Sequence, residues 1–128
     1  MVDYSPKYTS CAFIRGFTSP PLDYSDVPEL ELLSKIQMVE DYVDTVYETG
    51  ANIPCALLVL SKLVQSPTLA QKYYTLRSET LGDYSYSLGG PRESSYSLSE
   101  TYEQMAHKML RMLSAKHNDK MRVYITNN

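Results

Sequence analysis

The clearest periodic pattern in the chain lies at residues 27–49, where apolar residues recur at steps of three and four. This spacing places them on one face of a helix that packs toward a core, and it leaves a strongly acidic opposite face. Asp26 is a candidate N-cap, followed by Pro28 in the first turn and Glu29 as in a capping box, and Gly50 can end the helix. The apolar face consists of Leu32, Leu33, Ile36, Val39, Val43, Val46 and Tyr47.

A second helix is predicted over residues 53–64, where apolar residues occur on every side. A helix of this kind is buried all round, so it should lie at the centre of the fold. Ser66 and Pro67 resemble an N-cap with proline at the first helical position, which predicts a short helix through Leu76. A kinked continuation of the preceding helix fits the same residues.

The character of the chain changes at residues 78–98, which are rich in Ser, Tyr and Gly. Tyr84, Tyr86 and Leu88 alternate with polar residues, as in a strand, and Gly89 and its neighbouring glycine favour a loose hairpin. Ser, Tyr and Gly are also the residues that adaptable protein-binding loops use, because Tyr gives contact area at small entropic cost. This segment is therefore expected to protrude and to bind a partner through these three side chains.

The last helix is predicted to begin near Ser97 or Ser99 and to reach about Lys116. Its apolar positions keep helical spacing and should pack against the first two helices. Residues 118–128 alternate apolar and polar side chains, which favours a short terminal strand. The helical positions are Tyr102, Met105, Ala106, Met109 and Leu113.

Residues 1–24 show no sustained period, and prolines and a glycine interrupt them, so they are expected to form an extended arm. Phe13 and Phe17 would be costly to leave in water, so the arm should dock on a neighbouring molecule. The sequence thus predicts a mainly α fold, a small bundle of three to four helices over residues 25–117. A protruding loop and extended terminal segments complete it.

Composition limits the classes of function. The chain has 128 residues, 43% of them hydrophobic and 21% charged, which is typical of one soluble globular domain. Its net charge of −3 gives no general attraction to nucleic acid, and its longest apolar run is too short to span a membrane. Cys55 lies in an apolar helix, where a buried free thiol is more common than a disulfide to Cys11.

Candidate chemistry is sparse. Glu103 and His107 stand four residues apart on the last helix, which is the spacing of half a metal site or of an acid–base pair. No second pair completes it, and the position of His117 near a helix end suits its interaction with the helix dipole. We therefore expect no catalytic residue, metal or cofactor, and a protein that is not an enzyme.

A family resemblance rests on the phrase from Ser78 to Leu88, which runs S-E-T-L-G-D-Y-S-Y-S-L after a hydrophobic helix pair. It resembles the head–tail connector (adaptor) proteins of long-tailed bacteriophages and related prophages. More weakly, the resemblance covers residues 26–117; the arm and the tail depart from the family pattern, which leaves their roles open.

The resemblance implies a virion protein made in the host cytoplasm and located in the neck between head and tail. Many copies form a ring under the portal protein, which we expect to be dodecameric. The ring meets a stopper or tail-completion protein on its other side, and DNA passes through its channel without sequence-specific binding. The alternatives are a tail-completion or stopper protein, which is more often largely β, and a small non-viral helical adaptor.

Charge asymmetry adds a hypothesis about ring closure. The first long helix is acidic, with Glu40 and Asp44 as representatives, whereas the last helix and tail are mainly basic, with Lys108 and Arg111. A ring needs two different complementary patches on each subunit. These four residues are therefore predicted to contribute to the interface between subunits, although charged outer helix faces are common in monomeric proteins too.

Overall fold

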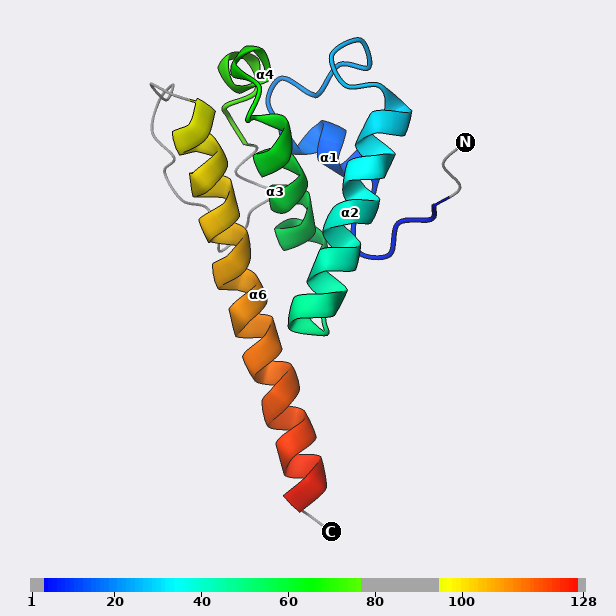
Figure 1. Cartoon of the computed structure of the whole chain (residues 1–128), viewed down its shortest axis with the longest axis vertical. Coiled ribbons are helices and arrows are strands. Elements are labelled where there is room, and N and C mark those ends of the chain that lie inside the picture. Colours follow the sequence, from blue (N-terminus) through cyan, green and yellow to red (C-terminus); the bar gives the residue numbers. More distant parts are fainter. Residues whose placement is uncertain (1–3, 77–94, 127–128) are drawn as a thin grey trace.

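A computed structural model describes residues 4–76 and 95–126, with side chains described for residues 4–76 and 98–116. Its described part is mainly helical and forms a small helical bundle, as the sequence predicted (Figure 1). The helices are α1 (Cys11–Phe17), α2 (Glu29–Tyr47), α3 (Asn52–Leu63), α4 (Pro67–Lys72) and α6 (Ser95–Thr126).

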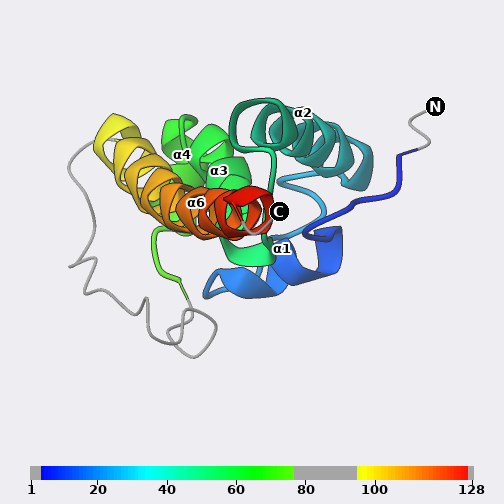
Figure 2. The same ribbon diagram turned by 90° about the horizontal axis from the view of Figure 1, so that it is seen from below.

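Helix α3 is the centre of the bundle. It packs against α6, α2 and α1, which surround it when the molecule is seen along its long axis (Figure 2). Its side chains from Pro54 to Ser61 are all buried, which confirms the prediction of a helix enclosed on every side. Pro67 stands at the start of α4, as predicted, but this helix ends at Lys72, before Leu76.

The predicted core face of α2 is largely confirmed, because Leu32, Ile36, Val39 and Val43 are buried. Val46, at the end of the same series, is instead 52% exposed. It lies near the C-terminal end of α2, where the helix leaves the core.

Both predicted ends of α2 are wrong in detail. Pro28 occupies the N-cap position, while the carboxylate of Asp26 accepts hydrogen bonds from Lys72 Nζ at 2.8 Å and Tyr73 Oη at 2.6 Å. At the other end, Glu48 adopts the left-handed conformation with φ of 60° and donates its N–H to Asp44. The helix therefore ends at Tyr47, three residues before Gly50.

Gly50 instead permits a close approach. A Cβ atom built on this residue would lie 2.7 Å from the ring of Tyr8. The N-terminal segment thus passes directly over the end of α2, and only a residue without a side chain leaves room for it.

The prediction of an extended arm over residues 1–24 is wrong for its central part. Residues 11–17 form α1, which Ser10 caps by accepting a hydrogen bond from the N–H of Phe13 at 3.1 Å. Ile14 and Phe17 are completely buried in the chain's own core, so Phe17 has no surface left to offer a neighbour. The reason is energetic, because burying these side chains within the chain outweighs the weak helical propensity of so short a segment.

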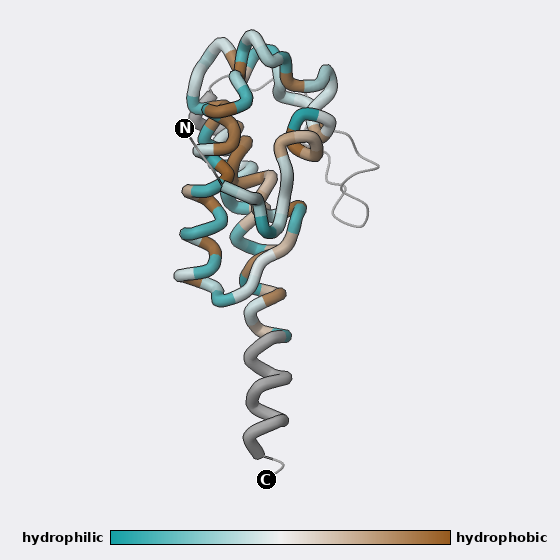
Figure 3. The backbone as a smooth tube through the Cα atoms, turned by 90° about the vertical axis from the view of Figure 1, so that its right-hand side faces the viewer, coloured by the Kyte–Doolittle hydropathy of each residue, from teal (hydrophilic) through white to brown (hydrophobic). Residues whose placement is uncertain are grey.

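The predicted C-terminal strand is also wrong. Helix α6 continues without interruption to Thr126, because residues 95–126 contain neither glycine nor proline to stop it. It also begins earlier than predicted, at Ser95, so the last part of the expected 78–98 loop is helical and Leu98 is buried. The tube in Figure 3 shows hydrophobic positions within the bundle, and the core cluster draws buried side chains from α1, α2, α3 and α6.

Candidate interaction surface

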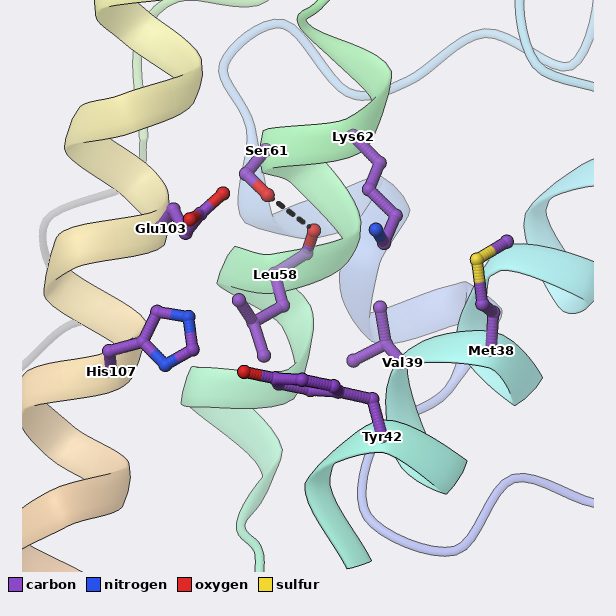
Figure 4. Close-up of a pocket in the computed structure, with 8 residues that line it drawn as sticks. All are labelled: Met38, Val39, Tyr42, Leu58, Ser61, Lys62, Glu103 and His107. Carbon is purple, nitrogen blue, oxygen red and sulfur yellow. Dashed lines mark hydrogen bonds between the residues drawn. The ribbon is translucent and has the colours of Figure 1, made fainter. Parts of the chain in front are cut away.

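Three helices converge around a pocket of about 340 Å³ (Figure 4). Helix α2 contributes apolar and aromatic side chains, α3 contributes Leu58, Ser61 and Lys62, and α6 contributes two titratable groups. The pocket therefore combines an apolar floor with polar groups at its edge, a combination typical of recognition sites. Its lining residues are Met38, Val39, Tyr42, Leu58, Ser61, Lys62, Glu103 and His107.

His107 is held in place at one wall of this pocket. Its Nδ1 atom lies 2.6 Å from the hydroxyl of Tyr47, and the ring of Tyr42 meets it edge-on with ring centroids 6.0 Å apart. Burial raises the pKa of the Tyr47 hydroxyl further above its ordinary value, which already keeps this group protonated at neutral pH. Figure 4 shows His107 and Glu103 on successive turns of α6, both at the pocket, as their four-residue spacing predicted.

A metal site would need further ligands beside this pair. In the ranges 4–76 and 98–116, no group of three or more His, Cys, Asp or Glu side chains is arranged to hold a metal ion. The pocket residues themselves offer one imidazole and one carboxylate. A zinc site takes three or four such protein ligands, so this pair alone supplies at most part of one.

Next to the pocket, α2 exposes a row of large apolar side chains. Met38 is 53% exposed, Tyr42 is 44% exposed and Val46 is 52% exposed, and these three residues follow one another at four-residue steps. We call them the α2 stripe. Neighbouring exposed apolar side chains of this size are a feature of binding surfaces. Val46 was predicted to lie in the core, and the sequence pattern did not single out Met38 or Tyr42.

Glu40 was predicted to lie on an exposed interface, and the structure contradicts this. The side chain is only 1% exposed and accepts hydrogen bonds from three consecutive backbone N–H groups. Lys7 and Tyr8 donate at 2.7 Å each and Thr9 at 3.0 Å, while the hydroxyl of Tyr4 donates to the same carboxylate. Residues 4–9, which we call the N-terminal strap, are thus fastened to α2 by one buried carboxylate.

Asp44 fastens the same strap one helical turn further on. It pairs with Lys7 Nζ at 2.9 Å and accepts a hydrogen bond from the hydroxyl of Tyr8. The bonds from Tyr8 and Lys7 hold the pKa of Asp44 below its usual value. Burial, together with the carboxylates of Glu40 and Asp44 respectively, raises the pKa of Tyr4 and Tyr8. Asp44 is therefore engaged within its own chain, contrary to its predicted role between subunits.

Arg15 is a structural residue that sequence reasoning missed. Only 6% exposed, it donates to the carbonyl of Val27 at 2.8 Å and pairs with Glu29 at 3.1 Å. The ring of Tyr24 stacks on its guanidinium, with 3.7 Å between the Cζ atom of Arg15 and the ring centroid. Nothing in the sequence indicates a buried arginine in a predicted extended arm, because Tyr24, Val27 and Glu29 lie 9 to 14 residues later in the chain.

The remaining predicted interface residues fall into three groups. Phe13 is half-buried and packs on Phe17, with ring centroids 5.3 Å apart, so it offers only part of its surface. Lys108 and Arg111 are exposed on α6, and their role between subunits stays a prediction. Tyr84, Tyr86 and Leu88 lie outside the described residues, as does the predicted hairpin.

Comparison with known proteins adds no relative. No protein-family model matches the sequence, and no curated protein or solved structure was found to match it. Among the described helices, none has the length and apolar character needed to cross a bilayer.

Proposed function

We propose that this chain is an assembly subunit of a virion, a head–tail connector that forms a ring under the portal protein and joins the head to the tail. The observation that carries the assembly part is the surface formed by the α2 stripe and the adjoining pocket, together with a helix α6 that continues beyond the bundle (Figure 1). A small bundle that leaves apolar side chains uncovered and extends one helix is suited to binding other proteins.

The more specific assignment to a connector rests on the sequence phrase from Ser78 to Leu88. The mainly helical bundle fits what that resemblance implies, and it favours a connector over a tail-completion or stopper protein of largely β architecture. A ring in this position would contact the portal protein on one side and a stopper or tail-completion protein on the other. DNA would pass through its channel.

Imaging the purified full-length chain with the portal protein of the same virus tests the proposal. We expect negative-stain electron micrographs to show an added ring of density at the tail-facing end of the portal. Portal protein alone is the control. If the portal images are unchanged by an excess of folded chain, the connector assignment is wrong. Binding to a cellular protein in place of the portal would favour the non-viral adaptor.

A further inference from the structure

The C-terminal half of α6 continues beyond the last side chains that attach this helix to the core. Leu110 is buried and Leu113 packs against the core, but Arg111, Met112 and Lys116 are exposed. The helix then continues to Thr126 and extends past the ends of α2 and α3 (Figure 1). At 1.5 Å per residue, the part after Leu113 is about 20 Å long. We call residues 111–126 the α6 extension.

A helix of this length gains from a partner. Most helical stability in proteins comes from packing of an apolar face, so a segment of helix that leaves its own bundle is stabilised by a partner surface. The extension is also basic, because its sequence contains Arg111, Lys116, Lys120 and Arg122 against Asp119. A partner surface for it should therefore be acidic and partly apolar.

The outer side of α2 has this chemistry. The α2 stripe provides exposed apolar side chains, Glu31 and Asp41 on the same helix are exposed carboxylates, and so is Glu48 at its C-cap. The other acidic groups of α2 have partners within the chain: Glu29 pairs with Arg15, while Glu40 and Asp44 hold the N-terminal strap. Surplus negative charge thus lies along α2 with the stripe, while the pocket contains one carboxylate, Glu103, and one ammonium group, Lys62.

The extension of the same chain cannot occupy this surface. The first half of α6 itself lines the pocket through Glu103 and His107, and the helix has no break between Ser95 and Thr126 that would let it fold back. The complementary helix must come from another molecule. The charge complementarity lies within one sequence, which favours a second copy of this chain.

We infer that the α6 extension of one copy docks along the α2 stripe and pocket of the next copy. The contact joins two different patches, so it is heterologous and leads to a closed ring or to an open helical filament, depending on the rotation between copies. This inference deepens the proposed connector function and rests on it for the closed ring. The contact itself can be tested without a portal protein.

Sedimentation velocity of the full-length chain tests for this contact. At low salt we expect the weight-average sedimentation coefficient to rise with protein concentration. The variant Met38→Lys/Val46→Lys should remain monomeric, because it places two positive charges in the stripe. Leu30→Lys is the matched control, since Leu30 is 57% exposed on the same helix and lies outside the stripe, and it should associate like the wild type. Circular dichroism and melting temperature establish that each variant is folded.

A mixing experiment then tests which patches meet. A chain that ends at Lys116 keeps the α2 stripe and lacks most of the extension, whereas Met38→Lys/Val46→Lys keeps the extension and lacks a working stripe. Each should be monomeric alone, and together they should form a one-to-one complex. The inference is overturned if the wild type stays monomeric, if the stripe variant associates normally, or if the mixture forms no complex. Portal binding without self-association would overturn this interface and leave the connector proposal standing.

Discussion

Glu40 holds the N-terminal strap to α2 through three backbone N–H groups and one hydroxyl, all donated by residues 4–9. A glutamine in its place keeps the size, but its amide NH₂ group faces donors where a carboxylate oxygen stood. We expect Glu40→Gln to lower the free energy of unfolding by about 2–3 kcal/mol, because hydrogen bonds to a buried charged group are lost. Urea denaturation measures the change. Asp41→Asn, on an exposed neighbour, should change it by less than about 0.5 kcal/mol, and an equal loss in both variants would contradict this role for Glu40.

Asp44 makes attachment of the strap dependent on pH. Its pKa is lowered in the folded protein by the hydroxyl of Tyr8 and by Lys7, so its contribution to stability is present above the unfolded pKa of about 3.9 and is lost as pH falls through the folded value. We expect the amides of residues 7–9 to exchange faster in acid, after correction for the intrinsic pH dependence of exchange. Asp44→Asn should remove the contribution of Asp44 to this increase in exchange rate, while the contacts of the strap with Glu40 remain. An unchanged pH profile in that variant would show that Asp44 does not contribute.

Two glycines give a matched pair with effects of opposite sign. Ala at position 50 would place a Cβ atom against the ring of Tyr8, whose hydroxyl is held by Asp44, so Gly50→Ala should cost about 1–3 kcal/mol. Gly16 lies within α1, and a Cβ atom added there would have no neighbouring atom within 4 Å, so Gly16→Ala should stabilise the protein by about 0.5–1 kcal/mol. Thermal unfolding compares them. Destabilisation by both substitutions would indicate that a methyl group at position 16 does not fit beside α1.

At the residue scale, the sequence does not distinguish Glu40 from Asp41. Both are acidic residues in the same turn of α2, and the partners of Glu40 lie 31 to 36 residues earlier in the chain. The Glu103–His107 pairing was predictable because the helix itself brings the two residues together. The contacts of His107 with Tyr42 and Tyr47 were not, because they join separate helices.

At the element scale, α1 tests whether the N-terminal region belongs to the core. Phe17 is completely buried, so Phe17→Ala should lower the free energy of unfolding of the monomer by about 3–5 kcal/mol. Phe13 is only half-buried, and Phe13→Ala should cost clearly less. Denaturation in urea at a concentration where the chain is monomeric measures both. Unchanged monomer stability in Phe17→Ala would favour the arm that docks on a neighbour.

The helices that could be predicted from sequence are those with strong local signals. The core face of α2, the apolar enclosure of α3 and the Ser66–Pro67 start of α4 all depend on residues within the element itself. Helix α1 has only seven residues and lies between Pro6 and Pro20. Its apolar side chains pack into a core formed by later parts of the chain, so the local sequence does not indicate a helix. The alternation after Lys116 favoured a strand, but continuation of an unbroken helix prevailed over that local pattern.

For the whole molecule, the contrast between an acidic α2 and a basic α6 remains, although the exposed residues that produce it differ from those predicted. Glu40 and Asp44 act inside the chain, so reversing their charge would release the strap and would not probe an interface. Asp41 is exposed on α2 and Glu48 at its C-cap, and Arg111 and Lys116 are exposed on α6. These four residues are the ones to exchange in a test of electrostatic complementarity between copies.

We expect Arg111→Glu/Lys116→Glu and Asp41→Lys/Glu48→Lys each to self-associate more weakly than the wild type, because each confronts like charges across the proposed contact. Mixed together, the two variants should associate again, since the acidic extension of the first meets the basic α2 of the second, and the unchanged patches of both still match.

High salt should weaken wild-type association, as the Debye length falls from about 10 Å at 0.1 M to about 3 Å at 1 M. Each exposed pair contributes only about 0–1 kcal/mol, so the charges should mainly affect the association rate and the choice of register. Stopped-flow light scattering measures that rate; no recovery on mixing, together with indifference to salt, would show that charge does not direct this contact.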